Sequence, residues 1–329
     1  MLTSAPSAAR TQPGAGRRAR RRREIALGYL FLAPALALLL VFDFFPIFYG
    51  LYISSCDWRL RCVKFIGLGN YTRALGDPDA WHSLLVTATY AGISIPVQLG
   101  LGLLLSYLLF QKIRGRDAFR VIFFLPYITS TVASAAVWSY LYSPDTGPIN
   151  AALRAIGFQP LRWLGEPNGI FALLAGDLGI TTADWAGGPS LALISLIIFT
   201  TWVFTGYDVT IFLAGLANIP KDLYEAARVD GAGSWALFRH ITLPLLSPIT
   251  YFLLVFTVIG SFKAFNHIYI MTQGGPLDST TTASILIFNQ LYKLNQYGYS
   301  AALSFLLFFV ILVLTIVQNR LVGRRVVYG

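Results

Sequence analysis

Residues 218–248 read NIPKDLYEAARVDGAGSWALFRHITLPLLSP, a polar stretch set between apolar ones, and we call it the hairpin. Apolar residues recur at helical spacing on both sides of a glycine pair, Gly231 and Gly233. Glycine tolerates the positive φ that a sharp turn requires. The spacing therefore predicts two short helices joined by a tight turn, with Pro244 and Pro248 leading into the next apolar segment. The apolar positions are Leu223, Ala226 and Ala227 in the first helix and Trp235, Phe238 and Ile241 in the second.

Long apolar segments surround the hairpin on both sides. Of the 329 residues, 56% are hydrophobic and only 12% are charged, about half the charged fraction of an ordinary soluble domain. A helix needs roughly 20 mainly apolar residues to cross the ~30 Å hydrocarbon core of a bilayer. The composition therefore predicts an all-α integral membrane protein of about six transmembrane helices and argues against a soluble enzyme. The predicted spans lie near residues 27–49, 84–110, 118–142, 191–215, 249–270 and 299–320.

The net charge of +10 arises largely at residues 17–23, where RRARRRR supplies six arginines. A basic cluster just before an apolar span is typical of contact with membrane lipid, and we expect no nucleic-acid partner. If the N-terminus is cytoplasmic, the cytoplasmic segments hold 17 of the 25 Lys and Arg residues. The excess of positive charge on that side predicts a multi-pass protein with both termini in the cytoplasm.

Sequence motifs of the common catalytic classes are missing. The sequence has no G-x-x-x-x-G-K-[ST] segment, so the chain has no P-loop with which to bind ATP itself. Its three histidines form no H-E-x-x-H pattern, and no G-x-S-x-G segment is present. We therefore expect no enzymatic activity and no metal site in this chain, which leaves a role as a passage or a scaffold.

The hairpin resembles the EAA loop of the membrane subunits of binding-protein-dependent ABC importers. The matching residues are Glu225, Ala226, Ala227, Asp230, Gly231, Ala232, Phe238, Ile241, Leu243 and Pro244. Further segments are similar to sugar-importer permeases of the maltose and glycerol-phosphate type, namely FIGLGNY at 65–71, FRVIFFLPY at 119–127, WLGEPN at 163–168 and LAGLANIPKDLYEAA at 213–227. The resemblance covers most of the chain outside the N-terminal tail. Residues 171–189 depart from it, because this link is longer than usual.

The resemblance implies the transmembrane domain of a type I ABC importer in a bacterial or archaeal cytoplasmic membrane. The chain would be a permease subunit for a sugar, a di- or oligosaccharide, and would form half of the translocation path. The implied partners are a second, different but homologous permease, two ATPase subunits and an extracytoplasmic sugar-binding protein. ATP and Mg are expected on the partner ATPase, and this chain is expected to need no cofactor of its own.

The resemblance also assigns roles within the hairpin. The residues implied to couple to the ATPase are Glu225, Ala226, Ala227, Asp230, Gly231, Ala232, Phe238, Leu243 and Pro244. The small side chains of Ala226 and Ala227 would permit close docking, and Gly231 would supply the turn. For Glu225 there is an alternative, an intrahelical pair with Arg228 or Lys221 that is worth only a few tenths of a kcal/mol.

Polar residues at membrane depth mark a candidate substrate path, because they are costly in lipid. Lys263, Asn266 and His267 lie together in the fifth predicted span, next to Phe265. Aromatic faces beside hydrogen-bonding groups suit a neutral, hydroxyl-rich ring. Alternatively, Lys263 extends to the membrane surface or pairs with an acidic residue of another helix. Weaker candidates in other spans are Ser94, Gln98 and Asn289, whereas helix contact or solvation explains Asp208.

Composition divides the chain into successive regions. We predict a disordered basic tail at 1–24, a first transmembrane helix with an outer loop at 25–83, the importer domain at 84–320 and a second cytoplasmic tail at 321–329. Cys56 and Cys62 fall in the outer loop, where oxidising conditions permit a disulfide, but spacing alone does not distinguish a disulfide from two free thiols.

Two other classes of function compete with the importer. An ion-coupled secondary transporter usually has inverted repeats and discontinuous helices around acidic residues at the membrane midplane. No convincing internal repeat is visible in this sequence, and six spans are few for such a carrier. A membrane scaffold or receptor without a transport role is the third class. Copurification with an ATPase chain would favour the importer, and uptake without ATP would favour the secondary transporter.

Overall fold

The computed structural model describes residues 15–111, 114–177 and 187–325. The chain divides into two compact units, Met1–Ile53 and Ser54–Gly329, which we describe separately. Parts of three predicted regions lie outside the described residues: the start of the N-terminal tail, the middle of the 171–189 link and the last four residues. The outer loop from Ser54 onward belongs to the second unit.

The described part of the first unit is helical throughout. Helix α1 (Ala15–Leu39) continues through a π-helical turn (Leu40–Phe44) into α2 (Phe45–Ser54). The segment Arg20–Ser54 is long and apolar enough to cross a membrane: a stretch of 18 residues within it has a mean hydropathy of 2.5, and apolar side chains are exposed along the segment. The prediction of a disordered tail is wrong for residues 15–24, which form the first turns of α1. Arginine and alanine favour helix strongly enough to extend the span into the basic segment.

A small two-stranded sheet, closed by a disulfide, opens the second unit. Strands β1 (Cys56–Trp58) and β2 (Cys62–Phe65) pair antiparallel, and helix α3 (Gly69–Gly76) follows. Cys56 and Cys62 form a disulfide with their Cα atoms 5.4 Å apart, so the disulfide is the alternative that the structure adopts. The buried Asn70 side chain donates hydrogen bonds to the carbonyl groups of Ser54 and Cys56, which fixes α3 against the strands.

Four long helices form the frame of the second unit: α4 (Pro78–Phe110), α9 (Leu191–Asn218), α13 (Ser247–Phe262) and α16 (Tyr297–Leu321). Helices α4 and α9 pack along much of their length. Small residues permit this close approach, as is common between membrane helices. A Cβ atom placed on Gly102 of α4 would lie 2.8 Å from the Cβ of Asp208 on α9.

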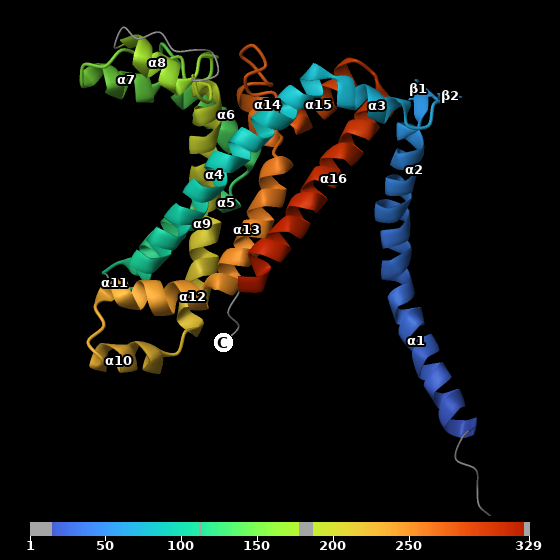
Figure 1. Cartoon of the computed structure of the whole chain (residues 1–329), viewed down its shortest axis with the longest axis horizontal. Coiled ribbons are helices and arrows are strands. Elements are labelled where there is room, and N and C mark those ends of the chain that lie inside the picture. Colours follow the sequence, from blue (N-terminus) through green and yellow to red (C-terminus); the bar gives the residue numbers. More distant parts are fainter. Residues whose placement is uncertain (1–14, 112–113, 178–186, 326–329) are drawn as a thin grey trace, which may run out of the picture. The chain divides into compact units, whose positions relative to one another are not determined.

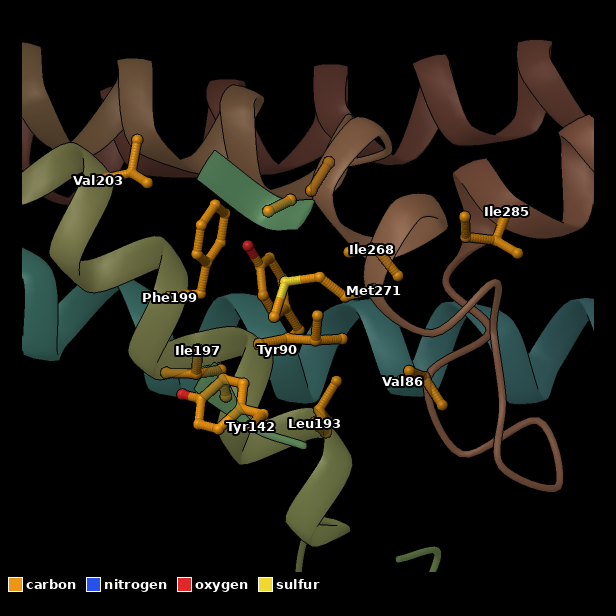
Figure 2. Close-up of a cluster of buried hydrophobic side chains, with 13 residues drawn as sticks. Val86, Tyr90, Tyr142, Leu193, Ile197, Phe199, Val203, Ile268, Met271 and Ile285 are labelled. Atoms are coloured by element: carbon orange, nitrogen blue, oxygen red, sulfur yellow. The ribbon is translucent and has the colours of Figure 1, made fainter. Parts of the chain in front are cut away.

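A core of buried apolar side chains joins α4 and α9 to α6, α14 and α15. Figure 2 shows Tyr90 of α4, Phe199 of α9 and Met271 of α14 within this cluster. A second cluster, centred on Phe212, Leu216 and Leu246, lies where α9 meets the start of α13. The second cluster therefore connects the bundle to the hairpin of residues 218–248.

The third predicted span is broken. Helices α5 (Arg116–Ile128) and α6 (Thr131–Leu141) are bent by 98° relative to each other, so the continuous helix predicted at 118–142 is wrong. Thr129 is extended at the break, and the Ser130 side chain caps the first turn of α6. The hydropathy of the segment conceals this break because both halves are apolar. In the described residues the protein therefore has five candidate spans, or six when the bent pair is one, which confirms the predicted fold class.

Shorter helices complete the chain. They are α7 (Pro148–Ala155), α8 (Ile170–Asp177), α10 (Lys221–Val229), α11 (Ser234–Leu237), α12 (Leu243–Leu245), α14 (Asn266–Met271) and α15 (Ala283–Phe288). Helical turns of other types lie at Phe238–Thr242, Asn289–Lys293 and Gly323–Arg325. Figure 1 shows α10 and α11 near one end of α9 and α7 and α8 near its other end. The hairpin is therefore separated from the loops at the far end by the length of α9, ~42 Å for 28 residues.

Candidate functional site

The hairpin has the two-helix form that its sequence predicts. Helix α10 ends at Val229, and Gly231 follows it with a φ of +85°. The Gly231 amide donates to the Arg228 carbonyl at 3.0 Å, and the Ala232 amide donates to the Ala227 carbonyl at 2.9 Å. These two bonds define a Schellman turn, which requires a left-handed residue and therefore favours glycine at position 231. By contrast, Gly233 is extended, with a φ of −74°.

The hairpin exposes much of its surface. On α10, Glu225 and Ala226 are exposed and Ala227 is half-buried, and Asp230 and Gly231 are exposed at the turn. Val229 is 88% exposed and Trp235 is 71% exposed, although both side chains are apolar. The remaining predicted coupling residues, which are half-buried, are Ala232, Phe238, Leu243 and Pro244. Exposed apolar and small residues are suited to docking with a partner protein.

The predicted substrate-path residues gather around one cavity in the bundle. Lys263, Phe265, Asn266 and His267 all line a cavity of about 210 Å³ between α4, α9 and α13. Helix α13 ends at Phe262 and α14 begins at Asn266, so the fifth predicted span is discontinuous at the cavity. Irregular backbone at membrane depth is tolerated where it lines a cavity. The break leaves the side chains of Lys263 and Asn266 exposed.

His267 occupies a different environment from its neighbours. Its ring is 5% exposed, and its Nε2 atom lies 3.0 Å from the Tyr90 hydroxyl and 3.1 Å from the Thr200 hydroxyl. The two hydroxyls are themselves 2.7 Å apart. His267 is therefore held in a buried three-residue network, and it ties α14 to α4 and α9 at the cavity wall.

A second polar contact joins α4 and α9 eight residues further along each helix, ~12 Å away. Gln98 Nε2 donates to Asp208 Oδ2 at 2.7 Å, and both residues are buried and line the same cavity. The helix contact expected for Asp208 is therefore present. The structure adds Gln98 as its partner.

Several residues of the cavity were not predicted from the sequence. Tyr90, Thr200 and Tyr207 line the cavity, but each lies within a long apolar helix where an isolated hydroxyl attracts no notice. Phe265, which lines the cavity, stacks on Tyr269 with ring centroids 5.3 Å apart. Helical spacing is the signal that could have identified Tyr90, because it shares one face of α4 with Gln98.

Comparison with known proteins identifies the family. Residues 82–327 match the family described as "Binding-protein-dependent transport system inner membrane component". The chain belongs to this family. It is therefore a permease, a membrane component of a binding-protein-dependent ABC transport system.

Two similar relatives are named transport permeases. The permease is 36% identical to the trehalose/maltose transport system permease protein MalF of Thermococcus litoralis, over 92% of this chain and 95% of that protein. It is 34% identical to the lactose transport system permease protein LacF of Rhizobium radiobacter, over 88% and 92% of the two chains.

A solved structure supports the fold of the permease. A bacterial alginate ABC transporter, crystallised in complex with an alginate pentasaccharide-bound periplasmic protein, contains a chain with a TM-score of 0.78 to this one. The two chains are 23% identical, and the match covers 94% of this chain and 98% of that chain. The permease therefore has the fold of a type I ABC importer transmembrane domain.

Proposed function

We propose that this permease forms half of the transmembrane path for a neutral di- or oligosaccharide in an ATP-driven importer. The observation that carries the proposal is the family match, together with relatives named for trehalose, maltose and lactose transport. The cavity supports it, because Lys263, Asn266 and Tyr207 offer hydrogen-bonding groups beside the ring of Phe265. An aromatic face with polar neighbours suits a hydroxyl-rich ring better than a bare ion.

We further propose that the hairpin receives a separate ATPase subunit. Exposed apolar and small residues on α10 and α11 support this role, as does the match of the hairpin to the EAA pattern. Two ATPase subunits, with their ATP and Mg, would drive the importer. A second, homologous permease would complete the path, and an extracytoplasmic binding protein would deliver the sugar. The Lys and Arg distribution supports cytoplasmic placement of the hairpin and of both termini.

Reconstitution of the complete assembly tests the proposal. The permease is expressed with its neighbouring transporter genes, purified through a tag on this chain, and placed in proteoliposomes with the binding protein. We expect an ATPase and a second permease to copurify, and uptake of at least one of trehalose, maltose and lactose to require ATP. Uptake driven by an ion gradient without ATP, or a purified chain without an ATPase, would contradict the proposal. Transport of only anionic solutes would contradict the neutral-sugar assignment.

A further inference from the structure

We propose, on the basis of the coupling role proposed above, that Tyr224 and Thr242 form a latch between the two arms of the hairpin. The latch ties α10, the helix that would contact the ATPase, to the arm that continues into α13. We infer that Tyr224 and Thr242 are positioning residues: they transmit the movement of α10 to the membrane span without touching ATP or sugar.

The latch is a directed chain of hydrogen bonds. The Tyr224 hydroxyl lies 3.0 Å from Thr242 Oγ1, and Thr242 Oγ1 lies 3.4 Å from the Leu237 carbonyl oxygen. Because a carbonyl oxygen only accepts, the Thr242 hydroxyl donates to Leu237 and accepts from Tyr224. Thr242 is fully buried. The bond therefore has one fully buried partner, and the Leu237 carbonyl sets its direction.

The turn that joins the two helical arms of the hairpin is not held in place by packing. The turn contains Gly231 and Gly233, and a Cβ atom placed on either glycine would meet nothing within 4 Å. An unpacked glycine turn holds two helices together but resists their relative rotation poorly. Tyr224 and Thr242 lie 18 residues apart in sequence and provide a second connection, so that the two arms move as one body.

Apolar packing around the latch joins it to the bundle. The Tyr224 ring packs against the buried cluster that contains Phe212, Leu216 and Leu246. Helices α9 and α13 approach closely at this cluster. A Cβ atom on Gly215 would lie only 2.1 Å from Ile249 Cδ1. Movement of α10 therefore reaches α9 and α13 through packed side chains as well as through the chain itself.

The arm on the Thr242 side has an irregular turn at this point. Residues Phe238–Thr242 form a π-helical turn, a rare conformation that occurs frequently at functional sites. Thr242 is the last residue of that turn, and its hydroxyl caps the Leu237 carbonyl before it. Phe238, at the start of the turn, packs edge-on against Tyr107 of α4 with ring centroids 4.9 Å apart. The turn thus connects the latch to a second long helix.

Tyr224→Phe and Thr242→Val test the latch, because each removes only hydrogen-bonding capacity. In the reconstituted assembly, the readout is the stimulation of ATP hydrolysis by the binding protein purified with its natural load. We expect each variant to retain the ATPase subunits and unstimulated hydrolysis, and to lose stimulation by about five-fold, which corresponds to the ~1 kcal/mol of one hydrogen bond. The double variant should lose no more than Thr242→Val alone, because that change already removes the bond to Tyr224.

Tyr251→Phe is the matched control. Its hydroxyl donates to Asn319 Oδ1 at 3.1 Å, an exposed bond between α13 and α16 far from α10 in sequence. We expect this variant to keep the stimulation of the original protein. Normal stimulation in Tyr224→Phe, or additive losses in the double variant, would overturn the latch. Loss of the ATPase from Tyr224→Phe would also overturn it, since α10 would then have lost its fold. Absence of an ATPase from the unmodified assembly would instead refute the proposed function.

Discussion

The hairpin and the cavity are built in contrasting ways from the same chain. The hairpin takes its residues from one continuous stretch, 218–248, and exposes Glu225, Val229 and Trp235. The cavity combines Tyr90, Thr200 and His267 from distant parts of the sequence and buries them. An exposed site depends on backbone shape and on a partner, whereas a buried one depends on every polar group being satisfied. The same substitution should therefore affect assembly in one region and stability in the other.

The strongest test of this contrast is Gly231→Val in the hairpin turn. A β-branched residue at a φ of +85° is strained by about 1–3 kcal/mol, and the strain would open the Schellman turn. We expect insertion into the membrane to be normal and copurification of the ATPase and transport to be lost. Affinity purification and an uptake assay measure the two effects.

Gly233→Val is the control in the same turn. Position 233 is extended and its side-chain space is open, so valine fits without strain. This variant should assemble and transport. If both variants fail equally, the loss comes from side-chain bulk at the docking surface and the backbone argument is wrong.

In the buried network we expect a loss of stability without a loss of assembly. Tyr90→Phe leaves His267 and Thr200 without one hydrogen-bonding partner in a water-excluded site, which costs about 1–3 kcal/mol. We expect a lower thermal unfolding temperature of the detergent-solubilised protein with the ATPase still bound. Tyr140→Phe, at a side chain that is 59% exposed on α6, should leave the temperature unchanged. Equal temperatures for both variants would remove the network from the stability of the bundle.

The contrast between the hairpin and the cavity also explains which features could be predicted from the sequence. The determinants of the hairpin are local: a turn at Gly231 follows from the spacing of apolar residues and from glycine chemistry, and the structure confirms it. The pairing of Tyr90 with His267 depends on how α4, α9 and α14 pack, which no local pattern records. The break at residues 263–265 was equally hidden, because Lys-Ala-Phe contains neither glycine nor proline. Long-range packing decides both features.

Substitution of Asn266 tests whether the cavity contacts the transported sugar. Its exposed side chain lines the cavity beside Phe265, so Asn266→Ala removes a proposed sugar contact worth about 1 kcal/mol, or about five-fold in uptake. We expect transport at saturating binding protein to fall while the unfolding temperature and subunit content stay unchanged. Asn319→Ala, at the exposed end of α16, is the control and should transport normally. Unchanged uptake in Asn266→Ala would exclude this side chain from the path.

The smallest effect on stability is expected for Glu225→Gln, and it decides what the hairpin surface is for. Among the described residues no ion pair involves Glu225, so the intrahelical pair with Arg228 or Lys221 is not formed. An exposed, unpaired carboxylate contributes within about 0.5 kcal/mol to folding. If Glu225 serves docking, the variant should unfold at the original temperature yet capture the ATPase more weakly, and the difference should shrink as salt screens the contact. Unchanged capture at low salt would show that the charge only solvates the helix, and docking would then rest on the apolar and small residues of α10 and α11.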